Sequence, residues 1–506
     1  MAGKNKNKRI VKNTIFLYFR MLFILFLSFF TTRVLLEKIG VEDYGLYTVV
    51  AGFVMMFGFI NTSMSNSIQR FINFEMGKNN LESTRKVFLS SLSVQLILGA
   101  IIFTLLEIIG SWYINNKLSV GPEMVFAANI LFQATCISLV LNIIKAPYNA
   151  ALIANEKMDL YAFLSILDAL LKLFIIYAIP YIPTERLVAY SILFLGTNIL
   201  ILLFTTYYVY KNVSYLKGLP IYNKALVKEM ISFSGWNLFG TASGVIKSQG
   251  INVLINAFFS LTVNASRGVA YQIHSGINQL THSFQVALNP QIVQSYSEGN
   301  MPRYLNLSYM SSKVSIFLMW MITLPILLCT DDILSIWLGN NIPQYTSLFT
   351  KIVVCTGMTD TLGAAISVPL YATGKIKYYQ IIVSLITISI LPLSYIFYRM
   401  GFPPETSMYI SLALSIIAQI ARVIIWTRLI NEPIINYIKK IVIPTIIIAS
   451  ISLIPPTIAP HLLKGTLHIT SIIYSTLYSI IINTILVFTI GINATERKTI
   501  YKLIKK

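Results

Sequence analysis

Charged side chains are scarce in this chain, and their scarcity limits the class of protein it can be. They make up 11% of the 506 residues, and only 19 residues are acidic. Soluble globular domains carry about 25% charged residues, so a string of soluble domains is excluded. Apolar residues account for 56% of the chain, and the mean hydropathy is +0.70. We therefore predict an all-α polytopic membrane protein.

Cysteine and histidine are also rare, which removes several chemistries. The chain has three cysteines, all inside apolar segments, and four histidines. The cysteines indicate small core residues, not a disulfide framework or a metal site. His274 and His282 are separated by roughly 12 Å along a helix, too far to share one metal ion. Because no phosphate loop or nucleophile elbow is present, we predict no enzyme, no catalytic residue and no cofactor.

Basic residues outnumber acidic ones, and the formal net charge is +20. In a soluble protein this charge would indicate a nucleic-acid partner. Here the basic residues cluster in the loops between apolar segments, so membrane lipids are the predicted partner and nucleic acid is not.

Apolar stretches divide the chain into about fourteen predicted transmembrane helices of about 20 residues each. The first is predicted to be a retained helix, because its apolar stretch is too long for a signal-peptide core. The thirteenth is the weakest, because three prolines interrupt it. The predicted segments are 13–36, 44–67, 88–111, 124–147, 160–182, 187–210, 232–257, 269–290, 313–337, 347–372, 376–398, 405–430, 442–459 and 467–490.

The Lys and Arg residues of the loops predict the orientation. With a cytoplasmic N-terminus, about four times as many of them fall on the cytoplasmic side as on the outer side. Both termini are then predicted to be cytoplasmic. No predicted loop is longer than about 25 residues, which leaves no room for an extramembrane catalytic domain.

Three sequence matches at a spacing of about 220 residues predict an internal duplication. A repeat of six helices keeps its orientation, so we expect two pseudo-symmetric six-helix bundles facing a shared cavity. The predicted domains are residues 1–230, residues 231–432, and two additional helices with a basic tail in residues 433–506. The matches pair Ile72–Asn80 with Val293–Asn300, Trp112 with Trp337, and Ala146–Lys157 with Val368–Lys375.

Lys247 lies near the middle of a predicted membrane helix. An ammonium at that depth costs roughly 2.5–3.5 kcal/mol on insertion scales, so it usually faces a cavity or a partner charge. Its helix is rich in serine and asparagine, and the next predicted helix has a polar stripe with helical spacing. These two helices and the first two are predicted to line the cavity. The polar residues predicted to line the cavity, which the resemblance described below assigns to sugar binding, are Asn66, Asn237, Gln249, Asn252, His274, Asn278, His282 and Gln285.

Cations at several depths predict an anionic ligand. Arg20 lies roughly 10 Å in from the cytoplasmic end of the first helix. Arg engages phosphate bidentately, so Arg20 and Lys247 are candidates for binding a phosphate or diphosphate, and the family resemblance described below adds Arg70 and Arg267. The i,i+4 spacing of Asp168 and Lys172 favours a structural ion pair over a transport role. Asp360 is the candidate for ion coupling, with neutralisation of a cation as the alternative.

Several stretches resemble one known family. They are residues 40–50, 233–259, 263–280 and 287–296. They are similar to parts of the bacterial O-antigen and polysaccharide flippases of the multidrug/oligosaccharidyl-lipid/polysaccharide exporter superfamily. The resemblance covers nearly the whole chain and is most specific over residues 233–296. It implies two six-helix lobes that move an undecaprenyl-diphosphate-linked oligosaccharide outward by alternating access. Polysaccharide polymerase and chain-length machinery would be its partners.

Four alternatives remain open. A cation-coupled multidrug antiporter of the same superfamily would favour an acidic cavity. A flippase for the peptidoglycan lipid precursor would share a cationic one. A membrane glycan polymerase or ligase should carry a large outer loop, and a structural scaffold would have little reason to bury Lys247.

Overall fold

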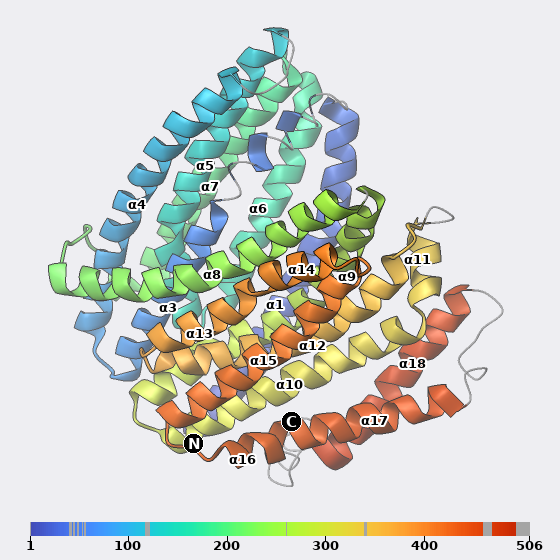
Figure 1. Cartoon of the computed structure of the whole chain (residues 1–506). Coiled ribbons are helices and arrows are strands. Elements are labelled where there is room, and N and C mark those ends of the chain that lie inside the picture. Colours follow the sequence, from blue (N-terminus) through green and yellow to red (C-terminus); the bar gives the residue numbers. More distant parts are fainter. Residues whose placement is uncertain are drawn as a thin grey trace. The chain divides into compact units, whose positions relative to one another are not determined.

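The computed structural model describes residues 2–39, 43, 46–47, 50–52, 54, 57–116, 122–259, 261–338, 342–458 and 468–491. Every regular element in these ranges is a helix (Figure 1), which confirms the all-helical prediction. The chain divides into two compact units, Met1–Leu238 and Phe239–Lys506. The boundary lies inside one helix, α8 (Lys224–Phe258). The predicted domain limits at residues 230 and 432 stay predictions.

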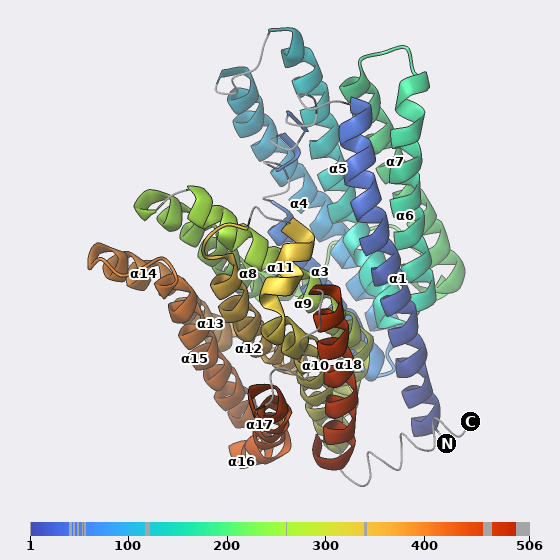
Figure 2. The ribbon, with the colours of Figure 1, turned by 90° about the vertical axis from the view of Figure 1, so that its right-hand side faces the viewer.

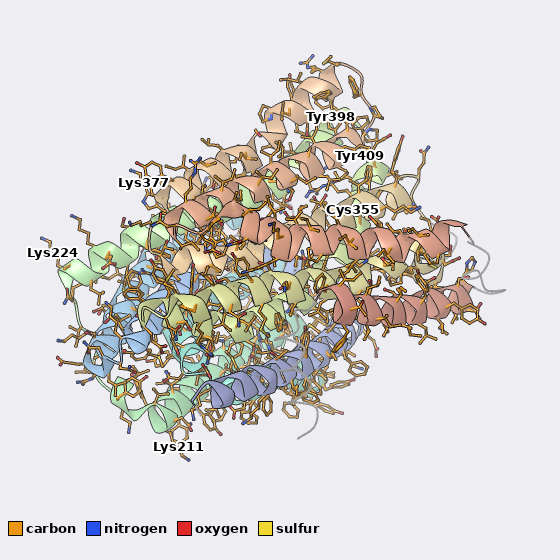
Figure 3. All side chains as sticks on the ribbon, turned by 90° about the horizontal axis from the view of Figure 1, so that it is seen from below. Lys211, Lys224, Cys355, Lys377, Tyr398 and Tyr409 are labelled. Atoms are coloured by element: carbon orange, nitrogen blue, oxygen red, sulfur yellow. The ribbon has the colours of Figure 1, made fainter. Side chains whose placement is uncertain are left out.

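The first unit is a bundle of long helices. Helix α5 packs against α3, α4 and α7, while α1 runs along α6 (Figure 2). Lys211 in α7 and Lys224 in α8 project from the ends of their helices (Figure 3). The helices are α1 (Ala2–Ile39), α3 (Gly58–Gly77), α4 (Leu81–Asn116), α5 (Pro122–Ala154), α6 (Met158–Ala178), α7 (Arg186–Asn212) and the first part of α8, with short 3-10 turns η1 (Ile179–Tyr181) and η2 (Ser214–Leu216).

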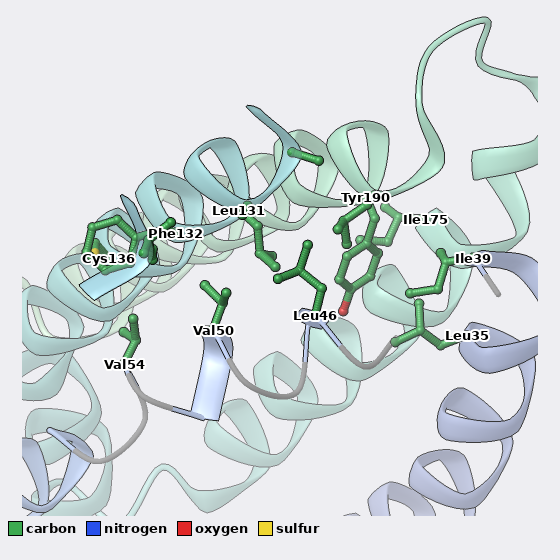
Figure 4. Close-up of a cluster of buried hydrophobic side chains, with 14 of the residues drawn as sticks. Leu35, Ile39, Leu46, Val50, Val54, Leu131, Phe132, Cys136, Ile175 and Tyr190 are labelled. Carbon is green, nitrogen blue, oxygen red and sulfur yellow. The ribbon is translucent and has the colours of Figure 1, made fainter. Parts of the chain in front are cut away.

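A cluster of apolar side chains forms the core of this unit (Figure 4). Phe132 and Leu106 are fully buried in it, and Cys136 lies beside them as the small core residue that the sequence predicts. The outer face of α4 is apolar as well, since Ile101 and Ile108 are 52% and 66% exposed. A helix that is apolar on both its inner and its outer face belongs in a lipid environment.

Ten helical stretches among the described residues are long and apolar enough to cross a bilayer, so the chain is a multi-pass membrane protein. The total of about fourteen stays a prediction. Three further predicted segments, 13–36, 232–257 and 269–290, each lie in one long helix: α1, α8 and α9 (Leu261–Ser297). These helices carry many polar residues and are not among the ten stretches. The predicted segment 44–67 falls partly outside the described residues. The ten stretches are Leu81–Trp112, Met124–Ala154, Met158–Tyr181, Arg186–Asn212, Met301–Leu328, Thr346–Ala372, Lys377–Arg399, Thr406–Leu429, Ile434–Pro455 and His468–Gly491.

The second unit is also a helix bundle. Helix α12 packs against α9, α10 and α15, and α18 packs against α10 (Figure 1). Four serines on one side of α10 are almost completely buried: Ser308, Ser311, Ser312 and Ser315. Small side chains let membrane helices approach closely. The helices are α9, α10 (Met301–Leu328), α11 (Thr330–Leu338), α12 (Thr346–Ala372), α13 (Lys377–Ile388), α14 (Ile390–Arg399), α15 (Thr406–Leu429), α16 (Ile434–Tyr437), the π-helical turn η3 (Ile438–Val442), α17 (Ile443–Ile458), α18 (His468–Leu486) and the π-helical turn η5 (Val487–Gly491).

The bounds of one predicted segment differ from those in the structure. The membrane-length stretch in this region is Met301–Leu328, not 313–337, and the helix ends at Cys329 before α11 begins. Hydropathy missed the first turns of α10 because they are rich in polar residues. Lys313, which the prediction placed at the start of the segment, is buried in the middle of α10.

Two turns that the sequence matches to each other also have matching geometry. Asn79, between α3 and α4, and Gly299, between α9 and α10, both have a positive φ, of 56° and 72°. In each turn the next residue caps the following helix. The side-chain oxygen of Asn80 accepts from the Ser83 amide, and that of Asn300 accepts from the Arg303 amide. The sequence match between the two halves therefore extends to backbone conformation and capping.

Candidate cation-lined cavity

A cavity of about 360 Å³ lies inside the first unit, between α1, α5, α6 and α7. Its size falls in the range of small-molecule sites, about 300–1,000 Å³. Charged, polar and apolar side chains share its wall. The lining residues are Arg20, Ile24, Lys145, Asn149, Tyr161, Leu164, Ser165, Asp168, Ala169, Lys172, Ile201 and Thr205.

Arg20 reaches the cavity from α1. Its Nη1 donates to the Ser165 hydroxyl at 3.4 Å, and its guanidinium carbon lies 4.8 Å from the centre of the Tyr161 ring. Both partners belong to α6, so one helix positions the guanidinium by a hydrogen bond and a cation–π contact. Arg20 Nε is buried and has no hydrogen-bond partner among the described residues. The arginine therefore keeps donor capacity that neighbouring side chains do not use.

Lys145 reaches the cavity from α5 and is half-buried. Over the part of the chain that the structure describes, it has no ion pair within 4.0 Å and no hydrogen bond from its ammonium. Asp168 and Lys172 both act on its charge. An ammonium inside a membrane-spanning helix is costly when it has no direct partner, so Lys145 is a candidate for binding an anionic ligand.

Asp168 and Lys172 form the ion pair that their spacing predicts. Lys172 Nζ lies 2.9 Å from Asp168 Oδ2, one turn along α6. The two side chains are 24% and 31% exposed, so the pair borders the cavity without being sealed from it. The second oxygen of Asp168 is buried and has no hydrogen-bond partner among the described residues.

Charge balance decides what the cavity can hold. Its wall carries three cations, Arg20, Lys145 and Lys172, against one carboxylate. A positive, partly desolvated wall concentrates anions. Arginine and lysine together provide the donors that phosphate groups prefer. Within the described ranges no group of histidines, cysteines and carboxylates could hold a metal ion.

Of the other predicted diphosphate-binding residues, Arg70 and Arg267 are engaged elsewhere. The Arg70 guanidinium lies over the rings of Phe71, Phe74 and Phe233, at 4.6, 4.9 and 5.3 Å. It is buried and does not line the cavity. A diphosphate role for Arg70 stays a prediction.

Arg267 ties two helices of the second unit together. Its Nη1 donates to the Asn252 side chain and its Nη2 to the Ser248 carbonyl at 3.2 Å. The guanidinium also lies 4.3 Å from the centre of the Tyr271 ring. These contacts use several of its donors for holding α8 against α9, and its predicted role in ligand binding stays untested.

Lys247 is half-buried in α8. No hydrogen bond or ion pair of its side chain is found within the described segments, but its charge acts on His274 of α9. Gln249, near it on the same helix, accepts from Asn252 at 3.1 Å and is exposed. Arg20 and Lys247 belong to different units.

The polar stripe of α9 divides into an inner and an outer part. Asn278 contacts His274 at 2.8 Å and the Thr361 hydroxyl at 3.4 Å. Gln285 is buried and donates to Ser315 at 3.1 Å and to the Thr361 carbonyl at 3.3 Å. These residues join α9 to α10 and α12, whereas His282 is exposed.

The remaining predicted residues fall in two places. Asp360 accepts a hydrogen bond from Ser415 of α15. Asn237 is fully buried and donates to the Ser63 carbonyl at 3.0 Å. Asn66, on α3, is half-buried. Their predicted roles in binding and coupling stay predictions.

Three residues that line the cavity, Lys145, Asn149 and Tyr161, are not among the site residues predicted from the sequence. The fourth predicted segment stopped at residue 147, which left Lys145 at the helix end and Asn149 in the following loop. In the structure α5 continues through Pro147 to Ala154. Proline is tolerated inside membrane helices, and recognising that would have placed Lys145 at membrane depth.

No family model matches the sequence, and no curated protein matches it either. Solved structures of MATE transporters do share its fold. A MATE transporter in complex with MaD3S is 15% identical, with a TM-score of 0.71 over 84% of this chain and 97% of that one. An outward-facing multidrug resistance MATE transporter of the MOP superfamily is 15% identical, with a TM-score of 0.70 over 84% and 96%.

A third solved structure comes from Pyrococcus furiosus. It is a MOP superfamily transporter for which reverse polarity of the binding pocket suggests a different function. It is 14% identical, with a TM-score of 0.66 over 84% of this chain and 96% of that one. The three likenesses show that the chain has the fold of MATE transporters of the MOP superfamily.

Proposed function

We propose that this chain is a flippase for a lipid-linked oligosaccharide whose carrier is undecaprenyl diphosphate. It would move the glycan from the cytoplasmic to the outer leaflet of the bacterial inner membrane by alternating access. The product would serve O-antigen, capsule or exopolysaccharide synthesis. Polymerase and chain-length machinery would receive it, and both termini would be cytoplasmic.

The observation that carries this proposal is the excess of cations on the cavity wall. Arg20 and Lys145 have no carboxylate within ion-pair distance among the described residues, and both line the cavity. A diphosphate diester carries the complementary charge and accepts from both side chains. The cavity volume of about 360 Å³ suits such a headgroup, and it is too small for the whole oligosaccharide.

Neutral polar groups beside the cations extend the proposed site. Asn149 and Tyr161 lie on the same wall and offer hydrogen bonds to the first sugar. The sugar-binding roles predicted for residues of α8 and α9 belong to this proposal, because exposed side chains such as Gln249 and His282 are able to reach a ligand.

The main rival is a multidrug antiporter, since the solved neighbours include multidrug transporters. A cationic drug would meet three cations and one carboxylate in the cavity described here, and like charges disfavour its binding. The P. furiosus protein is described as having a binding pocket of reverse polarity, which suggests a different function for it, so a proposal based on pocket charge has a parallel on this fold.

A peptidoglycan-precursor flippase would also carry a diphosphate, so the cavity charge does not separate it from the first proposal. A glycan polymerase or ligase needs catalytic groups that activate a bond. The cavity provides binding groups for an anion, and its one carboxylate is already paired. The transporter is therefore favoured over the enzyme.

The test is a flipping assay in proteoliposomes. Fluorescent undecaprenyl-diphosphate-linked glycan is reconstituted with the full chain, and an impermeant quencher reports which leaflet it occupies. Arg20→Gln and Lys145→Gln each remove one charge-assisted contact, worth about 1.5–3 kcal/mol. We expect transport at limiting substrate to fall roughly 10- to 100-fold in each variant.

Lys224→Gln is the matched control, because Lys224 is exposed at the start of α8 (Figure 3) and does not line the cavity. Equal rates in wild type and both cavity variants would contradict the proposal. Efflux of ethidium that survives in those variants, with no glycan movement in wild type, would instead establish the drug antiporter. A preference for the peptidoglycan precursor over other lipid-linked glycans would favour that flippase.

A further inference from the structure

Asp168 lines the part of the cavity where an anionic ligand would contact the cations. Its carboxylate is paired with Lys172 at 2.9 Å, and both side chains border the same space as Arg20 and Lys145. The pair therefore removes one of three cations from an arriving anion. Neither the fold nor the charge excess by itself explains why an anion site should contain a carboxylate.

The Asp168 carboxylate makes few hydrogen bonds. Asp168 Oδ2 accepts from Lys172, whereas Oδ1 is buried and has no hydrogen-bond partner among the described residues. A carboxylate has about four lone-pair sites, and structural carboxylates usually satisfy more of them. The contact with Lys172, one turn along the same helix, is thus the one hydrogen bond that the structure gives this carboxylate among the described residues.

Lys172 has a second contact that would hold it in place when Asp168 leaves. Its ammonium lies 5.4 Å from the centre of the Phe194 ring of α7. Lys145 lines the same cavity as Asp168 and Lys172, so a change in the pairing of these two residues changes the electrostatic potential at Lys145. The three groups thus form one electrostatic unit on the cavity wall.

We propose that Asp168 is an exchangeable counterion, which the anionic headgroup of the substrate displaces from Lys172 when it enters the cavity. This rests on the proposed function, because it requires that the ligand be an anion. The exchange makes the cavity selective by charge. An anion with one negative charge can bind Lys172 only if it displaces the Asp168 carboxylate. One negative charge then replaces another, so the exchange adds little binding free energy. An anion with two charges neutralises the three cations and the single carboxylate together.

The predicted substrate class is therefore a diphosphate diester with two negative charges, in preference to a phosphodiester with one. With no ligand present, Asp168 would partly neutralise the wall and lower the cost of an empty, positively charged cavity. With ligand bound, the freed carboxylate would stand beside an anion and would turn away from it.

The experiment uses the purified full chain in detergent and two small probes. Dimethyl phosphate carries one negative charge, and P1,P2-dimethyl diphosphate carries two. Binding of each is measured by calorimetry at neutral pH. We expect wild type to bind the diphosphate probe at least about tenfold more tightly. We expect Asp168→Asn to bind dimethyl phosphate about tenfold more tightly than wild type does, because no carboxylate then competes with the probe for Lys172.

Asp159→Asn is the matched control, because it removes the same charge from the same helix. Asp159 lies in the first turn of α6, 3.9 Å from Lys12, and does not line the cavity. Asp168→Glu keeps the charge and should retain the wild-type preference. Infrared difference spectra of wild type provide a second measurement. The diphosphate probe should shift a carboxylate band, and the shift should persist in Asp159→Asn.

The outcomes separate the two proposals. If wild type binds neither probe, the anion site of the proposed function fails. If wild type binds the diphosphate probe but Asp168→Asn gains no affinity for dimethyl phosphate, the exchange is overturned and the anion site stands. If Asp168→Asn does not fold, the infrared spectrum of wild type decides, and an unchanged carboxylate band overturns the exchange.

Discussion

Glu156 and Gly374 occupy the same turn in the two halves of the chain. Both have a positive φ, of 57° and 74°. Each is followed by a lysine, and the next helix begins at Met158 in one half and at Lys377 in the other. A left-handed backbone costs a residue with a side chain roughly 1–2 kcal/mol, whereas glycine adopts it freely. One half thus uses the residue suited to the turn, and the other retains a strained one.

Gly374→Ala should destabilise the protein by about 1–2 kcal/mol, because alanine is disfavoured at this φ. Thermal unfolding in detergent measures it. Gly235→Ala is the control, since Gly235 lies in α8, has a negative φ and has open space where a Cβ would stand. The reverse exchange, Glu156→Gly, should be neutral or stabilising. A loss of stability in Gly235→Ala equal to that in Gly374→Ala would contradict the explanation.

Gly357→Ala should destabilise the second unit by about 1–3 kcal/mol through overpacking. A Cβ there would lie 2.6 Å from the His274 ring and 2.8 Å from the Met319 methyl. This glycine lets α12 approach α9 closely enough for the Asn278 and Gln285 contacts to form. Gly244→Ala is the control on α8, where nothing lies within 4 Å of the new methyl. Equal melting temperatures for the two variants would show that the approach is not tight.

Features that depend on local spacing within one element were predicted best from the sequence. The i,i+4 pair of Asp168 and Lys172 follows from helical geometry alone, and the structure confirms it. The turns at Asn79 and Gly299 were likewise matched by sequence similarity, and the structure shows that both residues have a left-handed backbone. In each case one element decides the outcome, so neighbouring helices did not have to be known.

The cavity depended on tertiary structure. Arg20, Lys145 and Lys172 come from three helices, and no sequence spacing shows that their side chains meet. Hydropathy marks the lipid-crossing part of a helix, so it ended the fourth segment before Ala154 and placed Lys145 at its border. It also could not distinguish Gln285, which joins helices, from His282, which is exposed on the same stripe.

The predicted orientation is tested by labelling single cysteines with an impermeant maleimide in inverted and right-side-out vesicles. Lys217→Cys should react only from the cytoplasmic side and Arg399→Cys only from the outer side, because basic loops are retained in the cytoplasm. Both positions are exposed. The native protein provides the background, since Cys136 and Cys329 are buried and Cys355 is partly buried (Figure 3). Labelling of both sites from one side would refute the predicted parity.

Tyr161 should contribute to anion affinity through Arg20. Its ring centre lies 4.8 Å from the guanidinium carbon, and such contacts contribute about 0.5–2 kcal/mol. Tyr161→Leu should therefore weaken binding of P1,P2-dimethyl diphosphate by roughly 2- to 30-fold. Tyr161→Phe keeps the ring and should bind within about twofold of wild type.

Tyr177→Leu is the control for Tyr161, because Tyr177 is a half-exposed tyrosine on the same helix that does not line the cavity. It should leave diphosphate binding unchanged. If Tyr161→Phe lost as much affinity as Tyr161→Leu, the hydroxyl would be the contributing group. Tyr161 would then act by hydrogen bonding to the ligand, and the ring would not be what positions Arg20.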